Sequence, residues 1–335
     1  MRGLVLPPHL NRRAFIGMIV FGVVAAPLIA KAQLVKTVRS IGFLGPGVPE
    51  SSGELQEKYA PLRELGWIEG QNLVFERRYT NGKSELLRPL AEELVRLKVD
   101  LIVTEGTAAT LAAKSATDVI PIVFRTAGDP VRSGLVRSLA RPGGNVTGYS
   151  IVSPQLDAKR LAVLHEILPG VQRVGVLENS TNPYTRAARE DLAEICKSLG
   201  IQPIFVEVAA ATELENAVAE VARRGGQALF VPPETLFYQN RRELMAAALK
   251  HRLPATVARL VAREMGALVS YAPTQAEEND RAIAFIDRIL RGAKPGELPV
   301  EQPTKFDLII NLKTAKALGI IVPQTLLSRA SEVIQ

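Results

Sequence analysis

The chain has 335 residues, of which 47% are hydrophobic and 22% are charged. This length and composition are typical of an ordered protein with about two domains, and they exclude a mostly disordered or collagen-like chain. One cysteine and three histidines give no basis for a disulfide framework or a zinc cluster. The net charge of +7 first suggests a nucleic-acid partner.

The N-terminal residues 1–32 have the three parts of an export signal. The basic pair Arg12-Arg13 precedes an uncharged apolar run at 14–30, and Ala30-Lys31-Ala32 is a small-x-small cleavage motif. The paired arginines favour the twin-arginine route. We predict a signal peptide cleaved after Ala32 and a periplasmic mature protein. The alternative is an uncleaved membrane anchor, because the run is only slightly shorter than the roughly 20 residues of a spanning helix.

Most of the excess charge lies in this segment. Residues 1–32 contain four basic residues and no acidic one, so the rest of the chain has 37 basic against 34 acidic residues, a net charge of +3. A nearly neutral mature chain no longer argues for a polyanion, and we expect no nucleic-acid partner. The single cysteine, Cys196, falls on the apolar face of an expected helix and is predicted to be a buried small hydrophobic residue.

The first half of the mature chain alternates short apolar runs with stretches of helical periodicity. Strands are expected at 40–44, 72–76, 100–103 and 121–124, and helices at about 55–65, 86–97 and 107–116. Thr107 is expected to cap the third of these helices.

The same order recurs in the second half, with strands at 173–177, 203–206, 228–231 and 255–257 and helices between them. Leu65-Gly66 before the second strand matches Leu199-Gly200, and Ile120-Pro121 before the fourth matches Leu253-Pro254. This duplicated βαβαβ plan predicts an α/β fold with two Rossmann-like lobes, each a parallel sheet covered by helices on both faces.

The two predicted lobes are joined by several crossing segments, which form a hinge. A further helix at 276–290 is expected to return to the first lobe, followed by another crossing near 295–303. We therefore predict lobe 1 at 34–150 plus about 274–298, and lobe 2 at 151–273 plus about 299–335. Hinge closure around a cleft is a known way to sequester a ligand.

Ligands of open α/β sheets bind beyond the carboxyl ends of the strands, so the loops at those ends are the candidate site. Backbone N–H groups at helix starts favour a carboxylate or phosphate, and acidic side chains, among them Glu178, could receive a cation. Both features together suit a zwitterion such as an amino acid; the alternative is that these are ordinary turns and caps. The candidates are Glu105, Gly106, Thr107, Gly128 and Asp129 in lobe 1, and Asn179, Ser180, Thr181, Asn182 and Glu234 in lobe 2.

Four stretches resemble one protein family: Ile41–Leu44, Leu65–Asn72, Arg141–Gly148 and Gln302–Gly319. The chain resembles, from about Arg39 to its C-terminus, the ABC-transporter substrate-binding proteins that include the tryptophan/tyrosine-type binding proteins. The resemblance implies a type I periplasmic binding protein fold with three crossovers and a ligand in the cleft. It also implies delivery of a small solute to a membrane permease and its ATPase, with no chemistry on the solute.

The resemblance adds two candidate ligand residues, Gly47 after the first strand and Phe237 in the second lobe. It also marks two departures, because Glu105 stands where a small residue is typical and Glu178 where an asparagine-rich loop is typical. These acids predict a solute with a cationic group, or merely a different solute from tryptophan. Phe237, Tyr238 and Tyr271 could stack on a flat ligand, or could pack in the core or hinge.

Other chemistries find little support. The glycines at 42, 45 and 47 do not form G-x-G-x-x-G because Glu50 occupies the next glycine position, and neither a P-loop nor a G-x-S-x-G motif occurs. His165 and His251 lie on expected helices rather than cleft loops. We expect no catalytic residue, metal or cofactor. The alternative functions are a ligand-binding sensor for a membrane receptor kinase and an exported enzyme.

Overall fold

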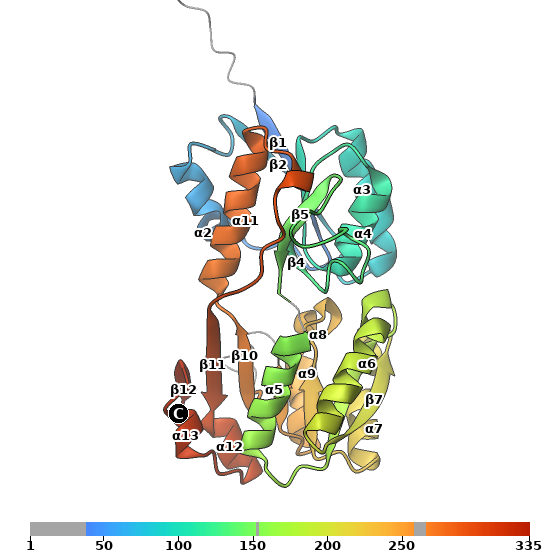
Figure 1. The fold of residues 1–335 in the computed structure, drawn as a ribbon, viewed down its shortest axis with the longest axis vertical. Coiled ribbons are helices and arrows are strands. Elements are labelled where there is room, and N and C mark those ends of the chain that lie inside the picture. The colour runs from blue at the N-terminus through green and yellow to red at the C-terminus, as the bar shows by residue number, and fades with distance from the viewer. Residues whose placement is uncertain (1–37, 152–153, 258–265) are drawn as a thin grey trace, which may run out of the picture. The chain divides into compact units, whose positions relative to one another are not determined.

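The computed structural model describes residues 38–151, 154–257 and 266–335. The predicted signal peptide at 1–32 lies outside these residues. Residues 39–335 contain two separate β-sheets flanked by helices, so the predicted α/β fold with two lobes is confirmed (Figure 1). We call the first sheet with its helices lobe 1 and the second sheet with its helices lobe 2.

Lobe 1 is built on a fully parallel sheet of five strands in the order β2-β1-β3-β4-β5. Its strands are β1 (Arg39–Gly45), β2 (Leu73–Tyr79), β3 (Leu101–Thr104), β4 (Ile122–Ala127) and β5 (Val146–Ser150). Its helices are α2 (Ser52–Glu64), η1 (Ser84–Leu86), α3 (Leu87–Arg96), α4 (Thr107–Ala116), α11 (Gln275–Leu290) and η3 (Pro295–Glu297).

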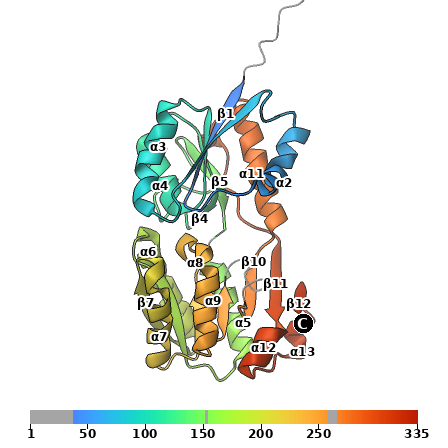
Figure 2. The same ribbon diagram turned by 180° about the vertical axis from the view of Figure 1, so that it is seen from behind.

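Alternating side chains of these strands pack on opposite faces of the sheet, as the twofold period of a strand requires. Ile41 and Phe43 of β1 pack in the cluster that α2 and α11 cover, while Leu44 packs in the cluster of α3 and α4. The predicted return of a C-terminal helix to the first sheet is therefore observed in α11, whose Ile286 is fully buried (Figures 1 and 2).

Lobe 2 has seven strands in the order β12-β11-β10-β9-β8-β6-β7. Its strands are β6 (Arg173–Asn179), β7 (Gln202–Val208), β8 (Ala228–Val231), β9 (Ala255–Val257), β10 (Val269–Pro273), β11 (Phe306–Asn311) and β12 (Glu332–Ile334). Its helices are α5 (Pro154–Ile167), α6 (Pro183–Ser198), η2 (Ala211–Glu213), α7 (Leu214–Arg223), α8 (Thr235–Gln239), α9 (Arg241–Lys250), α12 (Leu312–Leu318) and α13 (Gln324–Leu327). Only β10 and β11 pair in antiparallel fashion among the described strands.

The core of lobe 2 confirms the prediction for the single cysteine. Cys196 of α6 is fully buried and packs with Leu161 of α5 and Val176 of β6. Burial raises the pKa of its thiol to about 11, so the group stays protonated at neutral pH. Cys196 is therefore a packing residue.

The chain passes between the lobes after β5, at Thr274 and after Glu301. Glu301 still forms a β-bridge with Tyr149 of β5. The third crossing therefore begins near the end of the predicted range, 295–303. Glu277 of α11 ties the second and third crossings together. Its carboxylate accepts hydrogen bonds from the backbone N–H of Thr304 at 3.1 Å and of Lys305 at 2.9 Å. The predicted division of the chain at these residues stays a prediction.

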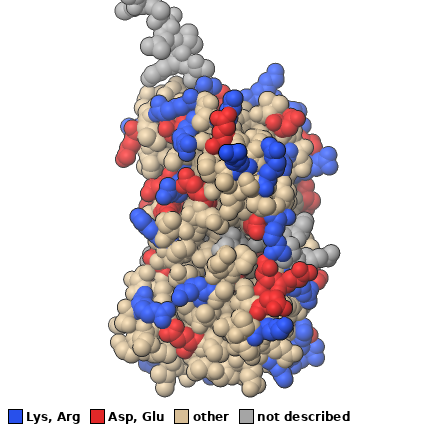
Figure 3. Space-filling model, in the orientation of Figure 1, with Lys and Arg blue, Asp and Glu red and all other residues tan. Residues whose placement is uncertain are grey.

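Charged side chains of both signs are interspersed over the face shown in Figure 3. This surface matches the nearly neutral net charge expected once residues 1–32 are set aside. No helix of the described residues is long and apolar enough to cross a membrane.

Candidate functional site

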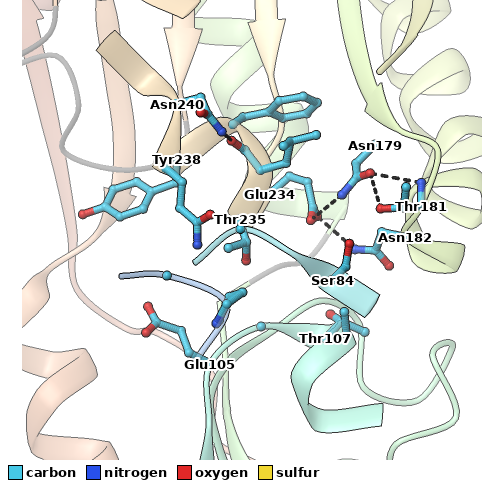
Figure 4. Close-up of a pocket in the computed structure, with 18 of the residues that line it drawn as sticks. Ser84, Glu105, Thr107, Asn179, Thr181, Asn182, Glu234, Thr235, Tyr238 and Asn240 are labelled. Atoms are coloured by element: carbon cyan, nitrogen blue, oxygen red, sulfur yellow. Dashed lines mark hydrogen bonds between the residues drawn. The ribbon is translucent and has the colours of Figure 1, made fainter. Parts of the chain in front are cut away.

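A pocket of about 700 Å³ lies between the two lobes, at the carboxyl ends of their parallel strands. Its walls come from the loops after β1, β2, β3 and β4 on one side and after β6, β7 and β8 on the other (Figure 4). This volume falls within the range of small-molecule sites. The pocket therefore lies where the strand-end rule predicts a ligand site.

Ten of the twelve predicted ligand residues line this pocket, and Asp129 and Ser180 do not. Lining the pocket are Gly47, Glu105, Gly106, Thr107, Gly128, Asn179, Thr181, Asn182, Glu234 and Phe237. Their contact with a solute stays a prediction, and their geometry decides what such a contact could be.

Asp129 shapes the loop after β4. Its Oδ1 accepts hydrogen bonds from the backbone N–H groups of Val131 and Arg132, each at 3.0 Å, and its carbonyl oxygen accepts one from the Ser133 hydroxyl. Ser180 is exposed, and its N–H donates to the carbonyl of Val208 at 3.1 Å. Asp129 therefore holds its own turn, and Ser180 joins the end of β6 to the end of β7.

Thr107 does not cap α4 as expected. The N-cap is Gly106, at φ +85° and ψ 161°, and no side chain of the described residues caps this helix. The Thr107 hydroxyl oxygen instead accepts a hydrogen bond from the N–H of Gly128 at 2.8 Å, which ties the β3 and β4 loops together. Thr107, Ala108 and Ala109 line the pocket, and the first N–H groups of a helix have no acceptor within it. Such a helix start attracts an anionic group.

Glu234 faces this helix start from lobe 2 (Figure 4). Its Oε1 accepts a hydrogen bond from Asn179 Nδ2 at 3.1 Å, and its Oε2 accepts one from Asn182 Nδ2 at 2.9 Å. Asn179 Oδ1 also accepts bonds from the N–H and hydroxyl of Thr181, so the loop after β6 is a connected unit. Burial raises the pKa of Glu234, and the hydrogen bonds from Asn182 and Asn179 partly oppose that rise.

The two acids that depart from the family pattern take different positions. Glu105 lines the pocket at the end of β3. Glu178 does not line it: its side chain is buried in β6 and pairs with Arg189 Nη1 at 3.1 Å. The guanidinium of Arg189 also lies 4.5 Å from the centre of the Phe205 ring. Glu178 therefore stabilises the lobe on the side of α6.

The three aromatic candidates also lie in different surroundings. Phe237 touches the pocket but is 98% buried in the core of lobe 2, so little of its ring is available. Tyr238 lines the pocket, and the Arg241 guanidinium lies 4.6 Å from its ring centre. Tyr271 stacks on Phe306 at 5.4 Å between β10 and β11, which is the packing alternative considered for it.

Several pocket residues were missed by the sequence reasoning. The loop after β2, with Thr80 to Ser84, and the loop after β7, with Ala209 to Ala211, both line the pocket. The same strand-end rule applied to every strand, rather than to the first, third and fourth alone, identifies both loops. Gln239 of α8 also lies in the pocket. It is part of a helix rather than of a strand-end loop, so the strand-end rule does not identify it.

Side chains of the two lobes meet around the pocket. A Cβ added to Gly106 of lobe 1 would lie 3.0 Å from Thr235 Oγ1 of lobe 2, and one added to Gly47 would lie 3.5 Å from Gln239 Nε2. Beside the pocket, Arg132 of lobe 1 forms an ion pair with Asp191 of lobe 2. The lobes are thus close enough to enclose a small solute.

The described residues contain no group of three His, Cys, Asp or Glu side chains that could hold a metal ion. The polar groups of the pocket are instead hydroxyls, carboxamides, a helix start and carboxylates. This set can bind and orient a small polar molecule through hydrogen bonds and charge.

Comparison with known proteins agrees with this geometry. The model of a family described as ABC transporter substrate binding protein matches residues 50–334. A tyrosine-binding protein of Clostridioides difficile is 26% identical over 259 residues, which cover 77% of this chain and 74% of that protein.

Two solved structures share the fold over most of the chain. A conserved domain protein from Vibrio cholerae has a TM-score of 0.83 and 26% identity, covering 88% of this chain and 99% of its own. An ABC domain from Streptococcus pneumoniae in complex with L-Trp has a TM-score of 0.81 and 24% identity, with the same coverage.

Proposed function

The chain belongs to the ABC transporter substrate-binding protein family, and we propose from this that it is the extracytoplasmic solute receptor of an importer. In this proposal the mature protein is periplasmic and released by cleavage after Ala32, as the export motif at 1–32 suggests. It presents its solute to a membrane permease and an ATPase. The solute is a small, amino-acid-like molecule held in the interlobe pocket.

One observation carries the choice of solute: a helix start of lobe 1 and a carboxylate of lobe 2 line the same pocket. The start of α4 in lobe 1 offers N–H groups, which suit a carboxylate. Glu234 in lobe 2 offers a carboxylate, which suits an ammonium group. An α-amino acid carries both groups on one carbon, so it can join the two lobes.

An aromatic or other flat side chain fits the remaining pocket. The Tyr238 ring lies in the wall of the pocket and keeps 38% of its surface exposed. The curated relative with 26% identity is named for binding tyrosine, which supports an aromatic amino acid as one candidate. Stacking on Tyr238 adds apolar contact area without fixing the identity of the side chain.

Binding proceeds by hinge closure in this proposal. A solute first contacts one lobe, and the three crossing segments then let the second lobe close over it. The solute shifts an existing equilibrium between open and closed forms, because it contacts both lobes only in the closed one. The protein releases the solute unchanged: the two histidines among the described residues, His165 in α5 and His251 after α9, both lie away from the pocket.

A thermal-shift screen of the mature protein with amino acids, purines and small carboxylates tests the proposal. A solute at a hundredfold excess over its dissociation constant stabilises the protein by about 2.7 kcal/mol, or roughly 5–10 °C in melting temperature. We expect at least one amino acid to produce such a rise. The proposal fails if purines or simple carboxylates stabilise the protein and amino acids do not, or if no small solute does.

A further inference from the structure

Two neutral carboxamides, rather than a cation, hold the carboxylate of Glu234. Asn179 and Asn182 donate to its two oxygens at 3.1 Å and 2.9 Å, and both donors are neutral carboxamides. The asparagines are 6% and 7% exposed, so protein contacts rather than water orient them. Each carboxylate oxygen therefore has a fixed direction before any solute binds.

Three of the four buried acids elsewhere in the described residues have a guanidinium beside them, and the fourth, Glu277, accepts hydrogen bonds from Thr304 and from the backbone N–H of Lys305. Asp157 pairs with Arg160 at 2.6 Å, Glu178 with Arg189 at 3.1 Å, and Glu278 with Arg125 at 3.5 Å. In these pairs the guanidinium cancels the charge of the carboxylate. Two carboxamides leave the charge of Glu234 in place.

Charged groups of the pocket do not replace such a cation. Burial and hydrogen bonds from Asn182, Asn179 and the N–H of Thr235 account for the shift in the pKa of Glu234, and no charged side chain among the described residues contributes to it. The other titratable side chains that line the pocket are Lys83, Glu85, Glu105, Tyr238 and Arg241. A positive group brought by the solute can therefore pair with this carboxylate.

We propose that Asn179 and Asn182 are positioning residues that favour the ionised form of Glu234 without cancelling its charge, and so make the pocket select solutes that carry an ammonium group. The inference rests on the proposed function and assigns amine selectivity to this pair. The asparagines need not touch the solute, because they act through the carboxylate that does.

The physical basis is the balance between burial and hydrogen bonding. Burial disfavours the charged form of Glu234, while hydrogen bonds donated to its oxygens favour that form. An arginine in place of the asparagines would also favour ionisation, but it would take the charge that an ammonium group needs. Neutral donors therefore favour the ionised carboxylate of Glu234 and leave its charge available to a cation.

This arrangement predicts a pH profile. The ammonium group binds the ionised carboxylate, so affinity falls as the pH drops through the pKa of Glu234 in the free protein, which lies above its usual value of 4.5. Removing a carboxamide donor raises that pKa further. The pH at which affinity is half lost should therefore move upward in Asn179→Ala and Asn182→Ala.

The experiment compares each amino acid with the same molecule lacking its amino group. The pairs are L-tyrosine with 3-(4-hydroxyphenyl)propanoate, L-phenylalanine with 3-phenylpropanoate, and L-leucine with 4-methylpentanoate, measured by calorimetry across pH. We expect the mature protein to favour at least one amino acid over its partner by about tenfold or more, the size of a hydrogen bond to a charged group. Asn182→Ala and Asn179→Ala should reduce this ratio and raise the pH midpoint.

A control variant removes a carboxamide that lies outside the pocket. Asn72 Nδ2 donates to the carbonyl of Gly66 at 2.9 Å, so Asn72→Ala removes a carboxamide that bonds elsewhere than Glu234. The selectivity ratio and the pH midpoint should stay at the wild-type values in this variant. Asn179 also holds Thr181, so Asn182→Ala decides the question alone if Asn179→Ala does not fold.

Each outcome has a distinct meaning. If the wild type prefers amino acids but the two asparagine variants keep both the ratio and the pH midpoint, the positioning role is refuted and the proposed function stands. If the wild type binds both members of every pair equally, amine selectivity itself is refuted, although the pocket still binds a small solute. If none of the six compounds binds and no amino acid of the thermal-shift screen does, both proposals are wrong.

Discussion

The ion pair between Arg132 and Asp191 should contribute to closure of the lobes. Arg132 lies in the loop after β4 of lobe 1, and Asp191 lies on α6 of lobe 2. Asp129 holds the Arg132 loop through hydrogen bonds to two of its backbone N–H groups. Because the pair can form only when the lobes are together, we expect Arg132→Ala and Asp191→Ala each to weaken solute binding.

The size of the effect follows from exposure. The Arg132 and Asp191 side chains retain 35% and 33% of their accessible surface, so water and salt screen their attraction. Exposed ion pairs contribute about 0.2–1 kcal/mol, and 1.4 kcal/mol corresponds to a factor of ten in affinity. The expected loss in affinity is therefore at most about fivefold, and it should shrink as salt is added.

Calorimetry with the amino acid found in the screen measures this loss for both single variants and the double variant, at about 20 mM and about 300 mM salt. The double variant isolates the pair from other contacts of either residue, because a coupled pair gives a double loss smaller than the sum of the single losses. Arg223→Ala is the matched control, since Arg223 pairs at 2.7 Å with Glu220 inside α7 of one lobe. Its affinity should equal that of the wild type.

Strictly additive losses, independent of salt, would refute the reasoning. So would a loss of the same size in Arg223→Ala, because that pair does not join the lobes.

Three further changes should have measurable effects. Glu234→Gln removes a carboxylate whose pKa is raised by burial. The loss of stability that ionising this acid causes as the pH rises above 4.5 should therefore be absent from the urea unfolding of the variant, and amino-acid binding should weaken; a pH dependence of stability equal to that of the wild type contradicts this. Gly106→Ala puts a Cβ on a residue at φ +85°, 3.0 Å from Thr235 Oγ1. It should lower the free energy of unfolding by about 1–3 kcal/mol and weaken binding. A variant with wild-type stability and wild-type affinity would contradict the strain argument. Burial raises the pKa of Glu277, but hydrogen bonds from Thr304 and Lys305 outweigh this effect and lower the pKa below 4.5. The stability that this hinge contact contributes should therefore be lost as the pH falls below 4.5. Melting curves of Glu277→Gln should lack this pH-dependent loss of stability.

Much of the fold could be predicted because strand and helix periodicities are local. The strands expected at 40–44 and 173–177 match β1 and β6, since their apolar runs are buried on both faces of a parallel sheet. The strands β10, β11 and β12 were not anticipated. They lie beyond the repeat, and β11 pairs antiparallel to β10 through contacts that no internal symmetry indicates.

The site was predicted to the level of loops but not of side chains. A loop at a strand end brings several polar residues near the pocket, and turn hydrogen bonds decide which of them face it. Asp129 is used in such a turn, and Ser180 joins the end of β6 to the end of β7. Glu178 precedes Asn179 in β6, and the alternation along the strand sends the two side chains to different environments.

The position of α11 in the chain determines when lobe 1 can be completed. This helix covers Phe43 and Val103 of the first sheet, yet it follows every strand of that sheet and five strands of the other lobe. A nascent chain that ends before α11 therefore leaves an apolar sheet face uncovered, and such a face is prone to aggregate. Neither lobe is a contiguous piece that one cut could separate. A fragment ending at Ser150 should become soluble only when a peptide containing α11 is supplied with it.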